Sequence, residues 1–138
     1  RNAQPQDFDR ALTVLESLAR SNCIPPDMLH RLATVLDALD INVPIPLWEA
    51  ASRTPQPNTG HLPDTGTLPD LQAAAKKREI GRTVLLVLKT IGNGGPDAAH
   101  LIALGDSIRA LRRVGLDSDA RRVGFEALFA GWPRGVIQ

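Results

Sequence analysis

Two of the three histidines are the residues of this sequence whose spacing most suggests metal chemistry. His30 ends the pentad PDMLH at 26–30, and His100 ends the pentad PDAAH at 96–100, seventy positions later. Imidazoles bind transition metals, but a site needs further ligands. Neither pentad is accompanied by a Glu-x-x-His pattern, a cysteine pair or a third histidine on a helix, and His61 lies in a proline-rich stretch. We therefore predict no metal and no cofactor, and we interpret both histidines as structural residues.

Other candidates for catalysis are equally isolated. Cys23 is the single cysteine, so it cannot form an intrachain disulfide, and no activating base accompanies it in the sequence. The glycine-rich residues 92–95 (GNGG) lack the lysine and hydroxyl of a phosphate-binding loop. We interpret them as a turn that ends a helix, and we predict no catalytic residue. A small-molecule enzyme or ligand carrier stays open as the second alternative function.

Basic residues cluster in the second half of the chain and suggest an anion-binding or nucleic-acid-binding surface. Acidic residues are interspersed among these basic residues, and no aromatic residue lies between them for base stacking. A solvated helix face is therefore the preferred interpretation, with an anion or nucleic-acid module as the first alternative. The candidate anion-binding residues are Lys76, Lys77, Arg78, Arg109, Arg112 and Arg113.

The two tryptophans are candidate interface residues. Trp48 and Trp132 each lie beside a proline or near the end of an expected helix. A tryptophan in such a place either seals the core or anchors a protein interface. For Trp48 core sealing is the default interpretation, whereas for Trp132 the sequence favours neither role over the other.

Composition indicates a helical domain of ordinary size. The 138 residues include 43% hydrophobic and 4% aromatic residues and no tyrosine, a balance that favours helix over sheet. The net charge of +1 indicates no particular partner, and no apolar run approaches the ~20 residues of a membrane span. Because the chain begins at Arg1 and not at a methionine, we expect it to be part of a larger polypeptide, with a processed mature chain as the alternative. Compartment is not predicted.

Apolar periodicity, prolines and glycines predict about six helices. Asp70 and Ser118 are the expected N-caps of two of them, and the apolar second half of the helix after Asp70 is expected to be buried. A proline-rich linker or surface loop is expected over 54–69. The predicted helices cover 7–20, 26–39, 47–52, 70–91, 96–114 and 118–129.

An internal repeat explains the two pentads. Aligning residues 10–33 with 80–103 gives eight identities, which predicts a duplicated helical hairpin. A similar aromatic-Glu-Ala step at Trp48 and Phe125 is offset by seventy-seven residues, so we expect two extra turns in the second hairpin's second helix. Unequal helices would leave a groove between the halves. We expect one all-α domain over 1–138 in which two three-helix halves, 5–53 and 70–132, share a core.

These observations predict a non-catalytic helical domain for protein–protein interaction or assembly. Its expected partner is another protein or another part of the same polypeptide, with a second copy and nucleic acid as alternatives. The groove between the halves is the expected docking site.

Overall fold

The computed structural model describes residues 10, 13–14, 17, 21 and 24–130, and this part of the chain is all-helical, as predicted. The loop at Cys23, the turn at Trp132 and most of the helix expected over 7–20 lie outside the described residues. Within the described part, no helix is long and apolar enough to cross a membrane. Its elements are α2 (Pro26–Ala38), α3 (Ile45–Ser52), α4 (Thr67–Lys76), α5 (Ile80–Ile91), the short 3-10 helix η1 (Pro96–Ala98), α6 (Leu101–Arg113) and α7 (Asp117–Phe129).

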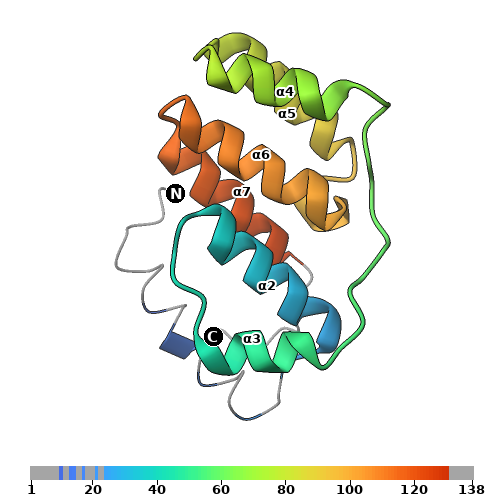
Figure 1. Ribbon diagram of the computed structural model, residues 1–138, viewed down its shortest axis with the longest axis vertical. Coiled ribbons are helices and arrows are strands. Elements are labelled where there is room, and N and C mark those ends of the chain that lie inside the picture. Colours follow the sequence, from blue (N-terminus) through green and yellow to red (C-terminus); the bar gives the residue numbers. More distant parts are fainter. Residues whose placement is uncertain (1–9, 11–12, 15–16, 18–20, 22–23, 131–138) are drawn as a thin grey trace.

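Helix α6 lies at the centre of the molecule and contacts α2, α4, α5 and α7 (Figure 1). Ala103, Gly105 and Ala110 are buried along it, and such small residues let neighbouring helices approach closely. A single core cluster draws residues from every α-helix between Pro26 and Phe129. The described helices therefore pack as one compact body.

Helix α2 is tied to η1 through a half-buried arginine. The Arg31 guanidinium donates from Nη1 to the carbonyl oxygen of Pro96 at 2.9 Å and from Nη2 to that of Ala99 at 3.2 Å. Burial lowers the pKa of Arg31, and the Asp97 carboxylate partly opposes this effect. Two carbonyl groups that precede α6 thus receive a charged donor from α2.

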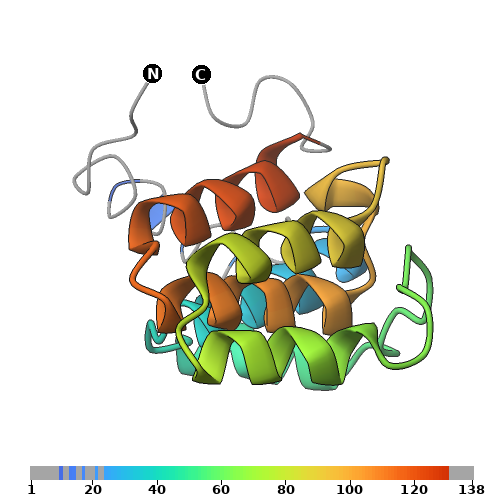
Figure 2. The same ribbon diagram turned by 90° about the horizontal axis from the view of Figure 1, so that it is seen from above.

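The single helix expected over 70–91 is wrong, because α4 and α5 form a hairpin of two helices (Figure 2). Arg78 takes a left-handed φ of 57° between them. Its N–H donates to Ala75 O at 3.0 Å, and the Glu79 N–H donates to Ala74 O at 3.0 Å. This pair of bonds is the Schellman motif, which terminates a helix and usually has glycine at the left-handed position.

The two extra turns expected in the second hairpin are absent. Helices α2 and α6 have 13 residues each. Pro96 begins η1 rather than α6, and His100 is the N-cap of α6, whereas His30 lies inside α2. The two pentads therefore fold differently, and the groove predicted from unequal helices loses its structural basis.

Both side-chain caps predicted at helix starts are wrong, although the predicted boundaries at Pro26 and Gly92 are right. Asp70 lies in the first turn of α4, whose N-cap is Gly66. Ser118 lies within α7, which starts one residue earlier at Asp117. By contrast, α2 begins at Pro26 as predicted, and α5 ends immediately before Gly92, which has a positive φ of 82°.

The proline-rich segment before α4 is bound to the helical body. The His61 N–H donates to Ala98 O at 2.9 Å, and the His100 N–H donates to His61 O at 3.0 Å. Gly60 has a φ of 113°, and a Cβ there would lie 2.6 Å from the His100 nitrogen. Only glycine fits so close to another backbone. The segment thus follows the surface as a loop, and α4 starts at Thr67.

Candidate docking surface

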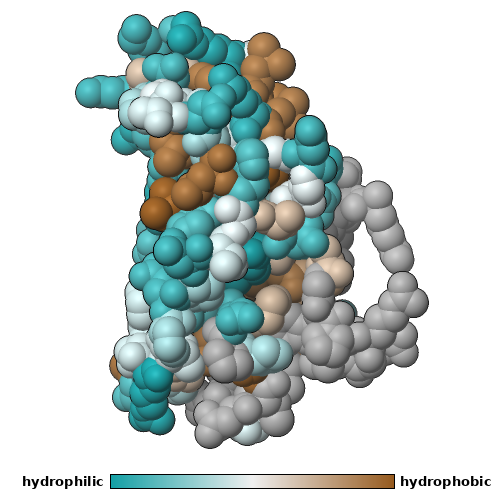
Figure 3. Space-filling view, turned by 90° about the vertical axis from the view of Figure 1, so that its right-hand side faces the viewer, coloured by the Kyte–Doolittle hydropathy of each residue, from teal (hydrophilic) through white to brown (hydrophobic). Residues whose placement is uncertain are grey.

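The outward side of α5 is apolar at its centre. Leu85 and Leu88 are 69% and 64% exposed, and Ile80 at the start of the helix is 52% exposed. Figure 3 shows apolar surface at the end of the molecule formed by α4 and α5. We call Ile80, Leu85 and Leu88 the α5 stripe. The opposite side of α5 faces the core through Thr83, Val87, Thr90 and Ile91.

Two exposed basic residues flank the α5 stripe. Arg82 precedes Leu85 by three residues and Lys89 follows it by four, so both are its neighbours on the helix surface. The nearest acidic group is the Glu79 carboxylate, whose Oε2 lies 4.0 Å from Arg82 Nε. The stripe therefore combines apolar area with a positive edge.

The turn before α5 adds three more positive charges, at 76–78. Lys76, Lys77 and Arg78 are all exposed, and none forms an ion pair with a described residue. We call these three residues the basic turn. Free surface charges of this kind attract acidic partners at long range and are screened by salt.

Gly81 leaves a notch in the α5 surface between Ile80 and Leu85. A Cβ built at this position would have no heavy atom within 4 Å among residues beyond its chain neighbours and its own helix backbone. The helix backbone is thus accessible there. A side chain from a partner could approach α5 more closely at Gly81 than over the leucines.

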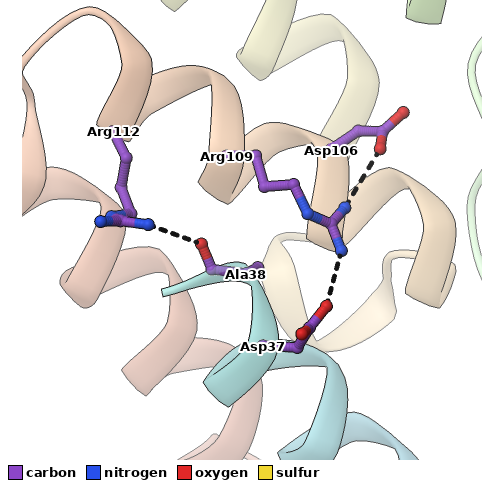
Figure 4. A network of polar contacts seen from close by, with 5 residues as sticks. All are labelled: Asp37, Ala38, Asp106, Arg109 and Arg112. Atoms are coloured by element: carbon purple, nitrogen blue, oxygen red, sulfur yellow. Dashed lines mark hydrogen bonds and ion pairs between the residues drawn. The ribbon is translucent and has the colours of Figure 1, made fainter. Parts of the chain in front are cut away.

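Two of the three predicted arginines of α6, Arg109 and Arg112, contact α2 (Figure 4). Arg109 lies 3.3 Å from Asp37 and 3.3 Å from Asp106, measured between guanidinium nitrogen and carboxylate oxygen. Arg112 Nη1 donates to the carbonyl oxygen of Ala38 at 3.4 Å. These contacts place the C-terminal ends of α2 and α6 side by side.

The six candidate anion-binding residues therefore divide into two groups. Arg109 and Arg112 are engaged within the fold, and Arg112 also lies 3.8 Å from the Asp117 carboxylate. Arg113 is exposed and, like the basic turn, has no ion pair among the described residues. The six residues do not form one uniformly free basic surface.

Trp48 does not seal the core. It is 52% exposed on α3, and Ile45, one turn earlier, is also exposed. The buried side of α3 consists of Leu47 and Ala51 instead. Trp48 therefore stays a candidate contact residue, and Trp132, the other predicted interface residue, lies outside the described residues.

Histidines from both pentads hold the loop that precedes α4. His30 Nε2 lies 2.8 Å from Thr54 Oγ1, and His100 Nε2 lies 3.4 Å from Asn58 Oδ1. His100 Nδ1 accepts a hydrogen bond from the Ile102 N–H at 3.1 Å. Among the described residues, no group of three or more histidine, cysteine, aspartate or glutamate side chains is placed to hold a metal ion.

Sequence reasoning missed the α5 stripe because it treated the apolar half of 70–91 as wholly buried. The available signal was the run of five apolar residues at 84–88, because five consecutive positions of a helix point to all of its sides. A core on one side of the helix cannot cover such a run, so the rest of it must be covered by other helices or left exposed. Only the structure decides between these cases.

Comparison with known proteins finds no matching family model, no similar curated protein and no similar solved structure. The function of the chain is therefore inferred from its own residues.

Proposed function

We propose that this chain is a non-catalytic helical domain for protein–protein interaction or assembly, with the α5 stripe as its docking surface. The observation that carries the proposal is the exposure of Leu85 and Leu88, 69% and 64%, one turn apart on a well-packed helix. Scattered exposed leucines need no explanation, but neighbouring ones beside an exposed isoleucine mark a surface suited to burial. Fully burying one leucine contributes about 1.5–3 kcal/mol.

The alternative functions have less support. An anion or nucleic-acid module would need the six candidate basic residues to form one free surface, but Arg109 and Arg112 already contact α2. An enzyme or carrier needs polar groups that converge on a pocket. The buried hydroxyls without a described hydrogen-bond partner, at Thr83, Thr90 and Ser107, lie inside the core rather than beside the stripe.

We also propose that the chain contains two related halves. The equal lengths of α2 and α6 and their direct packing are consistent with a duplicated hairpin, together with the eight sequence identities. The different structures of the two pentads limit the similarity to the helices. A fragment ending at residue 69 tests whether the halves need each other, because a monomer with a sharp thermal transition would contradict a shared core.

A photo-cross-linking amino acid at position 85 tests the docking surface without knowledge of the partner. The full-length protein is expressed in its native host with the cross-linker at Leu85 or, as a control, at the exposed Arg121 of α7. We expect a covalent adduct with another polypeptide from position 85 and none from position 121. Absence of an adduct from position 85 would refute the proposal.

A surface variant provides an independent check on the same protein. Replacing Leu85 and Leu88 with serine should change the free energy of unfolding by less than about 0.5 kcal/mol per residue, because both side chains are exposed. The variant should lose the partner while its circular dichroism spectrum stays that of the wild type. Retention of the partner by this folded variant would exclude the stripe.

A further inference from the structure

We infer that the element that docks on the α5 stripe is an amphipathic α-helix of another protein whose apolar side is flanked by acidic residues. The inference depends on the proposed function and adds the chemistry of the partner. Three observations carry it: the shape of the stripe, the charges around it and the poor fit of a second copy.

The shape of the stripe suits a helix. From Ile80 to Leu88 it extends eight residues, about 12 Å, which corresponds to two helical turns of a partner lying alongside. Helical partners bind such surfaces through apolar residues spaced three and four apart. The open backbone at Gly81 gives one such residue a place to insert. An added β-strand has no sheet edge to join in the described part of the chain.

The charges around the stripe select an acidic partner. Helices α4 and α5 with the turn between them carry five basic and two acidic side chains. Lys89 and the basic turn have no ion pair with a described residue, and Glu79 approaches only Arg82. Glutamate or aspartate beside the partner's leucines would therefore meet unpaired positive charges across the interface.

A second copy of this chain fits the same surface poorly. Arg82 and Lys89 lie on the same edge of the α5 stripe, so two α5 helices packed antiparallel, stripe against stripe, would bring these basic edges together. No acidic residue follows Glu79 in α5 to offset them. Like charges across an interface oppose association, so the antiparallel pair is disfavoured, and in a parallel pair α5 offers no acidic residue opposite the basic edge of the other copy. A membrane is also a weaker match, because binding to a lipid surface scales with the apolar area inserted, and Ile80, Leu85 and Leu88 are the only large apolar side chains exposed on α5.

Two synthetic peptides test the inference directly. Both are helical and carry leucines at positions i, i+3, i+4 and i+7, but one has glutamates beside the leucines and the other has lysines. Binding to the full chain is measured by fluorescence anisotropy at low and high salt. We expect the acidic peptide to bind at least about tenfold more tightly, with a preference that falls as salt rises. Equal binding of the two peptides would overturn the inference.

A charge reversal localises the effect to the stripe. Replacing Arg82 and Lys89 with glutamate should invert the preference, so that the lysine peptide binds better. Replacing Arg121 and Arg122 of α7 with glutamate changes the net charge equally and should leave the preference unchanged. If both double variants behave alike, the discrimination arises from overall charge and the stripe is not its source.

Two further measurements identify the competing occupants. If sedimentation shows a dimer of the wild type and a monomer of the Leu85→Ser variant, the occupant of the α5 stripe is a second copy of this chain and not an acidic helix. If the chain floats with anionic vesicles and this flotation depends on Leu85, the occupant of the α5 stripe is a lipid surface. In either case the inference fails. In a further outcome, position 85 cross-links to another protein but the chain binds the acidic and the lysine peptide equally. This result would support the proposed function and refute only the acidic character of the partner.

Discussion

Replacing Gly124 with alanine should destabilise the protein or leave its stability unchanged, whereas the same change at Gly81 should stabilise it. Both glycines lie within helices and have ordinary helical φ values. Alanine favours a helix interior over glycine by about 1 kcal/mol, and this preference has the same sign at Gly81 in the first turn of α5. The surroundings of the new methyl group therefore determine the difference.

The surroundings of Gly124 are closely packed. A Cβ there would lie 2.7 Å from Cγ1 of Val35 on α2, roughly 1 Å inside normal carbon–carbon contact. Val35 is fully buried and β-branched, so it cannot easily rotate away. Overpacking of this kind costs about 1–3 kcal/mol, which cancels or exceeds the gain in helix propensity. The two variants should thus differ by about 1–3 kcal/mol.

Urea denaturation followed by circular dichroism measures both free energies of unfolding. Val35→Ala removes the clashing methyl, so the double variant with Gly124→Ala should show a favourable coupling of about 1 kcal/mol in a mutant cycle. If Gly124→Ala stabilises the protein as much as Gly81→Ala does, or if the mutant cycle shows no coupling, then α7 does not pack against α2 at this distance.

Two further predictions concern helix ends. Arg78→Gly should raise the free energy of unfolding by about 1 kcal/mol, because glycine adopts the left-handed conformation without the penalty of a side chain; an unchanged urea midpoint would contradict it. His100→Ala should lower the free energy of unfolding by about 1 kcal/mol, since the acceptor for the Ile102 N–H is lost, while His100→Asn should retain most of it. Amide exchange at Ile102 checks this assignment, and equal protection in both variants would exclude the cap.

The helix boundaries at Pro26 and Gly92 were predictable from the sequence, whereas Pro96 begins η1 and not the predicted long helix. Pro26 fixes a φ that suits the first turn of α2, and Gly92 takes the positive φ that follows the end of α5. In both cases the residue type itself restricts the backbone. Such restrictions act locally and do not depend on what packs nearby.

The helix break at Arg78 was not predictable, whereas the end of α2 was predicted to within one residue. Asp40 and Arg78 both have left-handed φ values, 59° and 57°, and each follows the last turn of a helix. Arginine does not indicate this conformation, because a side chain on an L-residue disfavours it by about 1–2 kcal/mol, whereas aspartate is among the residue types that adopt it more often. Tertiary packing supplies the difference here: with the break, α4 and α5 can both contact α6.

The exposed side of α5 was unpredictable for a related reason. Sequence shows that α5 is apolar but not which of its sides α4 and α6 will cover. Thr83 and Thr90 are buried, whereas the more apolar Leu85 and Leu88 are exposed, contrary to hydropathy alone. An arrangement that leaves leucine outside and threonine inside is unfavourable for an isolated monomer. It is expected of a surface that another molecule covers.

The turn at Arg78 connects the fold to the proposed interaction. It reverses the chain so that α5 packs back along α4, and it places three basic residues at the start of the α5 stripe. Glycine at position 78 would make the same turn with less strain but would remove one positive charge. Arg78→Gly should therefore stabilise the protein and at the same time weaken binding of the acidic peptide. Unchanged peptide affinity in this more stable variant would separate the basic turn from the docking surface.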